Sequence, residues 1–136
     1  MADYVSKVEK VRRPIGQLYD ILSDFTKFSD LIPKDQAEDF EATENECTFT
    51  VKQLGKTGVR IIDKAQNSFV KYGANGKVPF DFLFWIQMKE AAPCDTRIKL
   101  TLRAELNMIM RGLMGKKLQK GIEQFAFHMA AALNGQ

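Results

Sequence analysis

A phosphate-binding loop is the first chemical motif that this sequence suggests. Gly55, Lys56 and Thr57 match the end of such a loop, in which glycine amides and a lysine surround a phosphate. The motif needs an earlier glycine where this chain has Thr50, and it must open a helix. Because the flanking residues alternate as in strands, we interpret the triplet as a tight hairpin turn and expect no nucleotide site.

The single histidine, His128, is a candidate general base at one end of a cavity. A histidine with no serine, cysteine or carboxylate partner in its pattern is more often a packed or solvent-edge residue. One histidine and the two distant cysteines, Cys47 and Cys94, cannot complete a coordination sphere. We therefore expect no metal ion and no other cofactor.

Tyr72 and Asp63 fall in neighbouring predicted strands, where a hydroxyl and a carboxylate would form an acid and base pair suited to enol chemistry. With Arg111 and His128 they are the polar groups that a cavity in this chain could contain. The alternative places the Tyr72 hydroxyl in water at a strand end and leaves Asp63 exposed. We favour these structural roles and assign no catalytic residue.

The first forty residues predict a strand followed by a broken helix. Residues 3–13 are rich in valine with interspersed charges, and Pro14 suits the first turn of a helix. Apolar residues then share one helical face, and the apolar run stops at Pro33. The residues of this face are Ile15, Leu18, Tyr19, Leu22 and Phe25, continued by Phe28, Leu31 and Ile32.

Between residues 38 and 106 the apolar period changes to two, which predicts about six antiparallel strands. Turn signals stand at 44–45, 55–58, 67, 73–76 and 93–95. Residues 80–90 predict a central strand, since Leu83 and Trp85 make its second face partly apolar. Its first face carries Phe80, Phe82, Phe84, Ile86 and Met88, and the clearest alternation places Ile98, Leu100, Leu102, Ala104 and Leu106 on one side.

Asn107 is a suitable N-cap for a final amphipathic helix of about 25 residues. Its apolar face holds Met110, Met114, Leu118, Ile122, Phe125, Met129, Ala132 and Leu133, and its polar side holds Lys116, Lys117, Lys120, Glu123 and Gln124. This order of elements predicts one α+β domain over residues 1–136, with helices on one face of an antiparallel sheet. Apolar residues facing inward then line either a cavity or a solid core. They are Phe49, Val51, Ile61, Phe82, Phe84, Ile86, Leu100, Leu102, Met110, Met114, Leu118, Ile122 and Phe125.

Composition narrows the possible partners and compartment. The net charge is +3, with 20 basic residues interleaved among 17 acidic ones, so we expect no nucleic-acid partner. The two cysteines fit a reducing compartment, and we see no signal peptide and no apolar run long enough to span a bilayer. We expect a cytoplasmic protein.

The segments PIGQLYDILSDFTKFSDLIP, TFTVKQLGKTGVRI and LTLRAELNMIMRGLMGKKLQKGIEQF, in this order, resemble those of a small bacterial member of the SRPBCC superfamily, also called START-like or Bet v 1-like. The resemblance covers the whole chain but includes no catalytic motif. It implies a helix-grip fold, in which a curved antiparallel sheet of six to seven strands grips the last helix and the short broken helix closes one end of a cavity. Members of the superfamily bind lipids, sterols, polyketides, quinones or plant hormones, and a minority catalyse cyclisation.

We therefore expect this chain to bind or transport a hydrophobic small molecule, such as a lipid, polyketide or quinone. One alternative is an interaction module that acts through the Trp85 face or through a basic helix face that meets a membrane or a protein partner. The other alternative is an enzyme of the cyclase or aromatase kind that acts in the cavity. The basic helix face comprises Ile109, Leu113, Lys116, Lys120 and Phe127.

Overall fold

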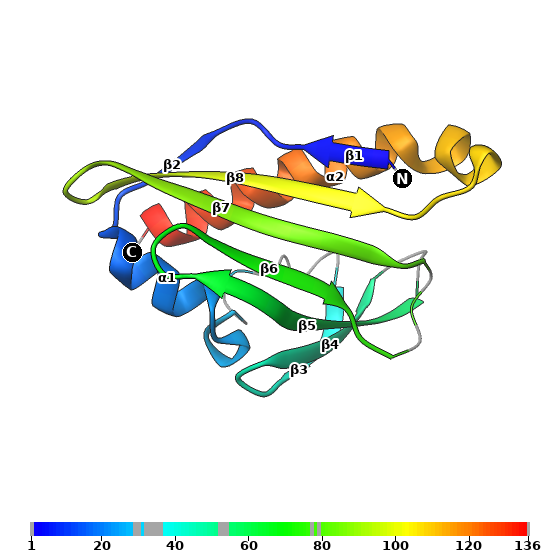
Figure 1. Ribbon diagram of the computed structural model, residues 1–136, viewed down its shortest axis with the longest axis horizontal. Coiled ribbons are helices and arrows are strands. Elements are labelled where there is room, and N and C mark those ends of the chain that lie inside the picture. Colours follow the sequence, from blue (N-terminus) through cyan, green and yellow to red (C-terminus); the bar gives the residue numbers. More distant parts are fainter. Residues whose placement is uncertain are drawn as a thin grey trace.

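The computed structural model describes residues 2–28, 31, 37–51, 55–76, 78 and 80–135. Within these ranges the chain forms a strand region, a short helical region, six further strands and a long final helix (Figure 1). This order is the predicted one. The elements are β1 (Ala2–Val5), β2 (Glu9–Val11), α1 (Ile15–Leu22), the 3-10 helix η1 (Phe25–Lys27), β3 (Ala37–Ala42), β4 (Glu46–Val51), β5 (Gly55–Ala65), β6 (Phe69–Ala74), β7 (Phe82–Ala92), β8 (Asp95–Ala104) and α2 (Met108–Asn134).

All strands belong to one antiparallel sheet with the order β1-β8-β7-β6-β5-β4-β3, and β2 also pairs with β8. The strand predicted over residues 3–13 is therefore two short strands on one edge, which brings the sheet to eight strands instead of six or seven. Ser6 explains the interruption. Its hydroxyl oxygen accepts from the Leu100 amide at 2.9 Å, and its own amide donates to the Leu100 carbonyl oxygen at 2.9 Å, so a side chain replaces part of the ladder.

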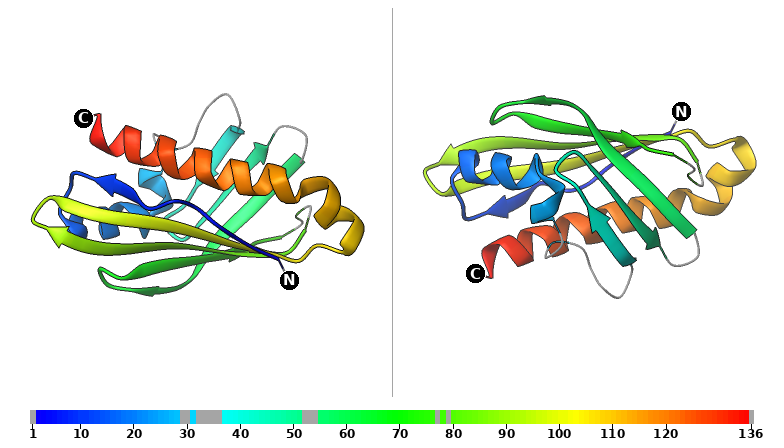
Figure 2. Two further views of the ribbon diagram at one scale, coloured as in Figure 1. Left: turned by 90° about the horizontal axis from the view of Figure 1, so that it is seen from above. Right: turned by 90° about the horizontal axis from the view of Figure 1, so that it is seen from below.

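The sheet curves around α2 in a helix-grip arrangement. Strands β7 and β8 run along the helix, whereas β3, β4 and β5 cross beneath it at a steep angle (Figure 2). The predicted alternation is confirmed, because Ile86 and Met88 of β7 and Ile98, Leu100 and Ala104 of β8 are all buried. The curved apolar face is thus the one that meets α2.

The broken helix closes one end of this assembly, beside the carboxy terminus of α2 (Figure 1). Helix α1 begins directly after Pro14, whose carbonyl oxygen accepts from the Leu18 amide at 3.1 Å. A 3-10 turn follows, in which the Asp24 carboxylate accepts from the Thr26 amide at 2.9 Å. The predicted face is confirmed, since Leu18, Leu22, Phe25, Phe28 and Leu31 are buried. The predicted stop at Ile32 and Pro33 lies outside the described residues.

Helix α2 is 27 residues long, and Asn107 caps it as predicted by accepting from the Met110 amide at 2.8 Å. All its buried residues lie in its second half, namely Ile122, Ala126, Met129, Ala130 and Leu133. They belong to one cluster with residues of α1 and the adjoining parts of β7 and β8. The core is therefore filled at the α1 end, and the first half of α2 contributes no buried residue.

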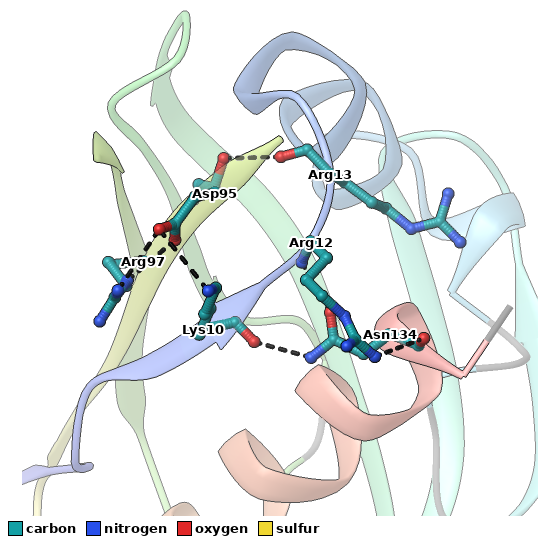
Figure 3. A network of polar contacts seen from close by, with 7 residues as sticks. Lys10, Arg12, Arg13, Asp95, Arg97 and Asn134 are labelled. Atoms are coloured by element: carbon teal, nitrogen blue, oxygen red, sulfur yellow. Dashed lines mark hydrogen bonds and ion pairs between the residues drawn. The ribbon is translucent and has the colours of Figure 1, made fainter. Parts of the chain in front are cut away.

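A polar network fixes the filled end of α2 to the strand β2 (Figure 3). The Asn134 amide side chain donates to the Lys10 carbonyl oxygen at 2.7 Å and accepts from the Arg12 backbone amide at 2.6 Å. Arg13 donates through Nε to the Leu133 carbonyl oxygen at 3.0 Å. Asn134 thus hydrogen-bonds to backbone groups of β2 and of the residue after it, and Arg13 donates to a carbonyl oxygen at the end of α2. Together these bonds hold the helix in a defined position across the sheet.

Candidate functional site

A pocket of about 600 Å³ lies between the curved sheet and α2. It is bounded by residues of the sheet strands, by the two phenylalanines of the η1 region and by one face of α2. Almost all of the lining is apolar. The lining residues are Phe25, Phe28, Phe40, Cys47, Phe49, Val51, Val59, Tyr72, Phe82, Phe84, Leu102, Met114, Lys117, Leu118, Gly121, Ile122 and Phe125.

Strand register explains how the sheet wall is assembled. Tyr72 of β6 stands opposite Phe84 of β7, which stands opposite Leu102 of β8, so these side chains form one row across three strands. On the other side of the pocket, Cys47 of β4 stands opposite Val59 of β5. Residues two apart on a strand share a face, which brings several rows into the same wall.

Aromatic rings form a continuous surface at the end of the pocket nearest α1. The Tyr72 ring lies 5.4 Å from that of Phe25 and 5.8 Å from that of Phe84, measured between centroids. Phe84 continues the contact to Phe125 of α2 at 6.2 Å. Aromatic pairs at such separations are attractive beyond simple burial, so these contacts stabilise this end of the wall.

The helix side of the pocket has a gap in its middle. Met114, Leu118 and Phe125 project from one face of α2 at helical spacing, and Gly121 falls between them. A Cβ atom built on Gly121 would have no neighbour within 4 Å. The missing side chain thus leaves room that any larger residue would occupy.

The two buried polar groups in the wall, Tyr72 and Cys47, are not arranged for acid–base chemistry. The Tyr72 residue is 1% exposed, and its hydroxyl donates to the Leu22 carbonyl oxygen at 2.5 Å. Burial raises the Tyr72 pKa well above its ordinary value. Burial also raises the pKa of the Cys47 thiol to about 12, so that thiol is neutral near pH 7.

Nine of the thirteen residues predicted to face a cavity line this pocket, and the other four lie elsewhere. Ile86 and Leu100 are fully buried in the filled core, because both strands pass from the pocket into that core along the same face. Ile61 packs against the same cluster, and Met110 packs against a smaller cluster with Tyr4, Ala104 and Leu106. The nine are Phe49, Val51, Phe82, Phe84, Leu102, Met114, Leu118, Ile122 and Phe125.

The acid and base pair considered for Tyr72 and Asp63 does not form. Asp63 is exposed, stands opposite Lys71 and accepts from the Lys64 amide at 2.8 Å, while Tyr72 is buried on the other face. A register shift between Ile61 and Asp63 separates the two groups. The alternative for Tyr72, with its hydroxyl in water, is also wrong.

The remaining polar candidates, Arg111 and His128, are exposed on α2 outside the lining. The His128 ring lies beside that of exposed Phe127, at 5.9 Å between centroids. Neither side chain lines the pocket, so Tyr72 is the one member of the four predicted polar groups that does.

The turn predicted at residues 55–58 is also wrong, because these residues begin β5 and pair with β4. Lys56 stands opposite Thr50, the position of the missing motif glycine. Gly58 has a different reason to be glycine, since a Cβ there would collide with the Asn75 carbonyl oxygen. A glycine required by close backbone approach thus resembles a turn signal in the sequence.

Sequence reasoning misses several lining residues. The helical projection places Lys117 on the polar side of the helix, yet it lies next to the apolar face and lines the pocket. The apolar pattern places Phe25 on an inward face but gives no sign that η1 borders a cavity. Cys47 has a usable signal, because it lies two positions from Phe49 on the same strand face. The other missed lining residues are Phe28, Phe40, Val59 and Gly121.

The basic helix face lies outside the pocket, as predicted. Ile109, Leu113 and Phe127 are 74%, 72% and 61% exposed, and Lys116 and Lys120 are exposed among them. The Trp85 face is different. The Lys71 ammonium lies 5.1 Å and the Arg103 guanidinium 5.5 Å from the Trp85 ring centroid, so two cations cover this ring.

Two further features of the described residues bear on the site. No helix among them is both long enough and apolar enough to cross a membrane. Across the same ranges, no three His, Cys, Asp or Glu side chains gather closely enough to hold a metal ion. Cys47 is buried and Cys94 is exposed, and both are free thiols.

Solved structures share this architecture. A START superfamily protein from Mycobacterium smegmatis superposes with a TM-score of 0.73 at 18% identity, covering 98% of this chain and 94% of that one. The chain has the START-like helix-grip fold. A protein from Thermus thermophilus matches with a TM-score of 0.69 at 17% identity, over 98% of this chain and 95% of that chain. The Aha1 protein of Colwellia psychrerythraea, solved as a dimer, matches with a TM-score of 0.64 at 13% identity, over 98% of this chain and 97% of that chain.

These likenesses establish a START-like, SRPBCC-type fold and confirm the resemblance drawn from the sequence. No protein-family model matches the chain, and no curated protein does either. Because one fold serves many activities, the function must be argued from the pocket itself.

Proposed function

We propose that this protein binds a hydrophobic small molecule in the pocket between its sheet and α2. The observation that carries the proposal is an apolar pocket of about 600 Å³ inside a small domain. Ligand sites commonly have volumes of about 300–1,000 Å³ and mostly apolar walls. Protein interiors otherwise pack as densely as organic crystals, so a space of this size is a departure that a ligand explains.

The division of α2 into two halves supports the same proposal. Its second half holds all of its buried residues, in the same apolar cluster as those of α1, and is anchored to β2 through Asn134, while Gly121 at its middle borders open space. The larger buried cluster therefore lies toward the second half of α2, and open space adjoins the middle of the helix. A polar group placed deep in the pocket would find few partners, because the Tyr72 hydroxyl is already bonded and the Cys47 thiol is neutral.

The same polar groups favour binding over catalysis. A cyclase or aromatase needs an acid or base directed at the substrate, within hydrogen-bonding distance of the proton it moves. Among the described residues, Asp63, Arg111 and His128 lie outside the pocket. The Tyr72 hydroxyl is the remaining candidate of the four, and its hydrogen bond to the Leu22 carbonyl oxygen directs its proton away from a ligand.

The proposal is tested with Nile red, a neutral dye whose fluorescence rises in apolar surroundings. We expect the wild-type protein to bind it, and Phe84→Asp to abolish binding by placing an uncompensated charge in the apolar wall. Phe127→Asp is the matched control, since it makes the same change on an exposed side chain. Met114→Glu repeats the test from the helix side if Phe84→Asp fails to fold. Equal dye binding by folded wild-type, Phe84→Asp and Met114→Glu proteins would refute the proposal.

A second candidate function is contact with an anionic membrane surface through the basic helix face. Its apolar members are largely exposed, and residues 108–120 carry Arg111, Lys116, Lys117 and Lys120 with no acidic residue. A helix face that mixes apolar and basic side chains binds anionic lipid by burial and charge together. We expect the protein to sediment with phosphatidylserine-containing vesicles and Leu113→Glu to weaken this. Sedimentation that does not depend on lipid charge would argue against this contact.

A further inference from the structure

Among the described residues, one charged side chain lines the pocket, and its position on α2 is informative. Of the seventeen described residues that line the pocket, Lys117 alone is charged. It is also exposed, so the pocket reaches solvent beside this residue. None of the salt bridges within the described residues involves Lys117. The cation is thus available to a ligand at the rim of an otherwise apolar space.

The wall toward α1 is different in character. It ends in the aromatic cluster of Phe25, Phe28 and Tyr72. On α2, Phe125 lies eight positions beyond Lys117, which corresponds to about 12 Å at 1.5 Å per residue. Phe49 and Phe82 also line the pocket, but its charged side chain lies about two helical turns from Phe125 and the α1 end.

We propose that the ligand is an amphiphile with an acidic head group, a long-chain carboxylate in its simplest form. Its head pairs with Lys117, and its apolar chain extends along α2, past Gly121, toward Phe84 and Phe125. This inference rests on the proposed function and specifies the class of ligand. A wholly apolar ligand could not form an ion pair with the ammonium group, and a cationic one would be repelled by it.

Helical position separates Lys117 from its basic neighbours. Lys116 and Lys120 lie on the exposed side of α2 and do not line the pocket, whereas Lys117 lies at its edge beside Met114 and Gly121. Charge-reversing variants of Lys116 and Lys117 therefore change the net charge equally but alter the pocket only at Lys117. This gives a matched control one residue away.

The experiment compares dodecanoate with dodecanol, which share a chain and differ in the head group. Each displaces Nile red from the wild-type protein and from Lys117→Met, Lys117→Glu, Lys116→Met and Lys116→Glu. A partly exposed ion pair stabilises a complex by up to about 1 kcal/mol, which is roughly fivefold in affinity. We expect Lys117→Met to weaken dodecanoate about three- to fivefold and Lys117→Glu to weaken it further. We expect dodecanol to be unaffected and the Lys116 variants to match the wild type.

Salt provides an independent readout, because ionic strength screens an ion pair near solvent. The preference of the wild-type protein for dodecanoate over dodecanol should fall as salt rises, and the Lys117→Met variant should show no such trend. Equal affinity for the acid and the alcohol, unchanged in Lys117→Glu, would overturn this inference while leaving hydrophobic binding intact. Failure of both compounds and of Nile red to bind would instead refute the proposed function.

Discussion

Replacing Gly121 with leucine should close part of the pocket while making the folded protein more stable. A Cβ at this position meets no atom within 4 Å, so the new side chain enters the pocket without a clash. Leucine is favoured over glycine inside a helix by about 0.8 kcal/mol. Partial burial of its side chain against Phe125 and Leu118 adds about 1 kcal/mol, given that full burial is worth about 1.5–3 kcal/mol.

The same substitution should weaken ligand binding. A ligand that uses the space beside Gly121 must displace the new side chain or shift, and overpacking of this kind costs about 1–3 kcal/mol. That range corresponds to a loss of roughly 5- to 160-fold in affinity. Nile red titration measures the affinity, and urea unfolding measures the stability of the same samples.

Gly112→Leu is the matched control for this prediction. Gly112 is a helical glycine with equal freedom around its Cβ position, but it is exposed and does not line the pocket. It should gain the propensity contribution alone and bind the dye like the wild-type protein. Wild-type affinity in a folded Gly121→Leu variant would refute the reasoning, because the pocket would then not be the site of binding.

Two further predictions concern buried polar groups. Tyr72→Phe leaves the Leu22 carbonyl oxygen without its donor and should lower the free energy of unfolding by about 1–3 kcal/mol, as measured in urea; an unchanged value would contradict a stabilising role for this hydrogen bond. Burial raises the Cys47 pKa from its ordinary value of 9.0 to about 12, so iodoacetamide should alkylate exposed Cys94 and spare Cys47 in the folded protein, as read by mass spectrometry. Between pH 9.0 and about 12 the unfolded chain loses this proton while the folded protein keeps it, so stability should fall as pH rises. Cys47→Ala should remove that part of the pH dependence, and rapid labelling of Cys47 would contradict its burial.

Much of the fold follows from apolar periodicity. The alternation at Ile98, Leu100 and Leu102 and the helical face from Met114 to Met129 depend on spacing alone, and the structure confirms both. The Asn107 cap can also be predicted from the sequence, because capping is a local interaction between a side chain and the next turn.

Strand register and the close approach of two backbone segments cannot be predicted from periodicity. Tyr72 and Asp63 lie on adjacent strands, but a shift in pairing places them on opposite faces, and no local pattern encodes that shift. Gly58 is glycine because the distant Asn75 backbone lies against it, which resembles a turn signal when only the sequence is considered.

The boundary between pocket and core is similarly hidden. Ile86 and Phe84 have the same parity and the same apolar character, yet one is fully buried and the other lines the pocket. What separates them is the position of α1 and η1 over one end of the sheet. Lys117 shows the same limit on the helix. It lies at the edge between the polar and apolar faces, and the sequence alone does not tell which of the two it belongs to.

Native mass spectrometry of the freshly purified protein tests ligand binding most directly. We predict a mass excess over the chain that disappears on denaturation, with the released compound recovered by solvent extraction as an acidic amphiphile. We also predict a smaller excess for Gly121→Leu than for Gly112→Leu. A native mass equal to that of the denatured chain, together with no binding of Nile red or dodecanoate, would contradict ligand binding in this pocket.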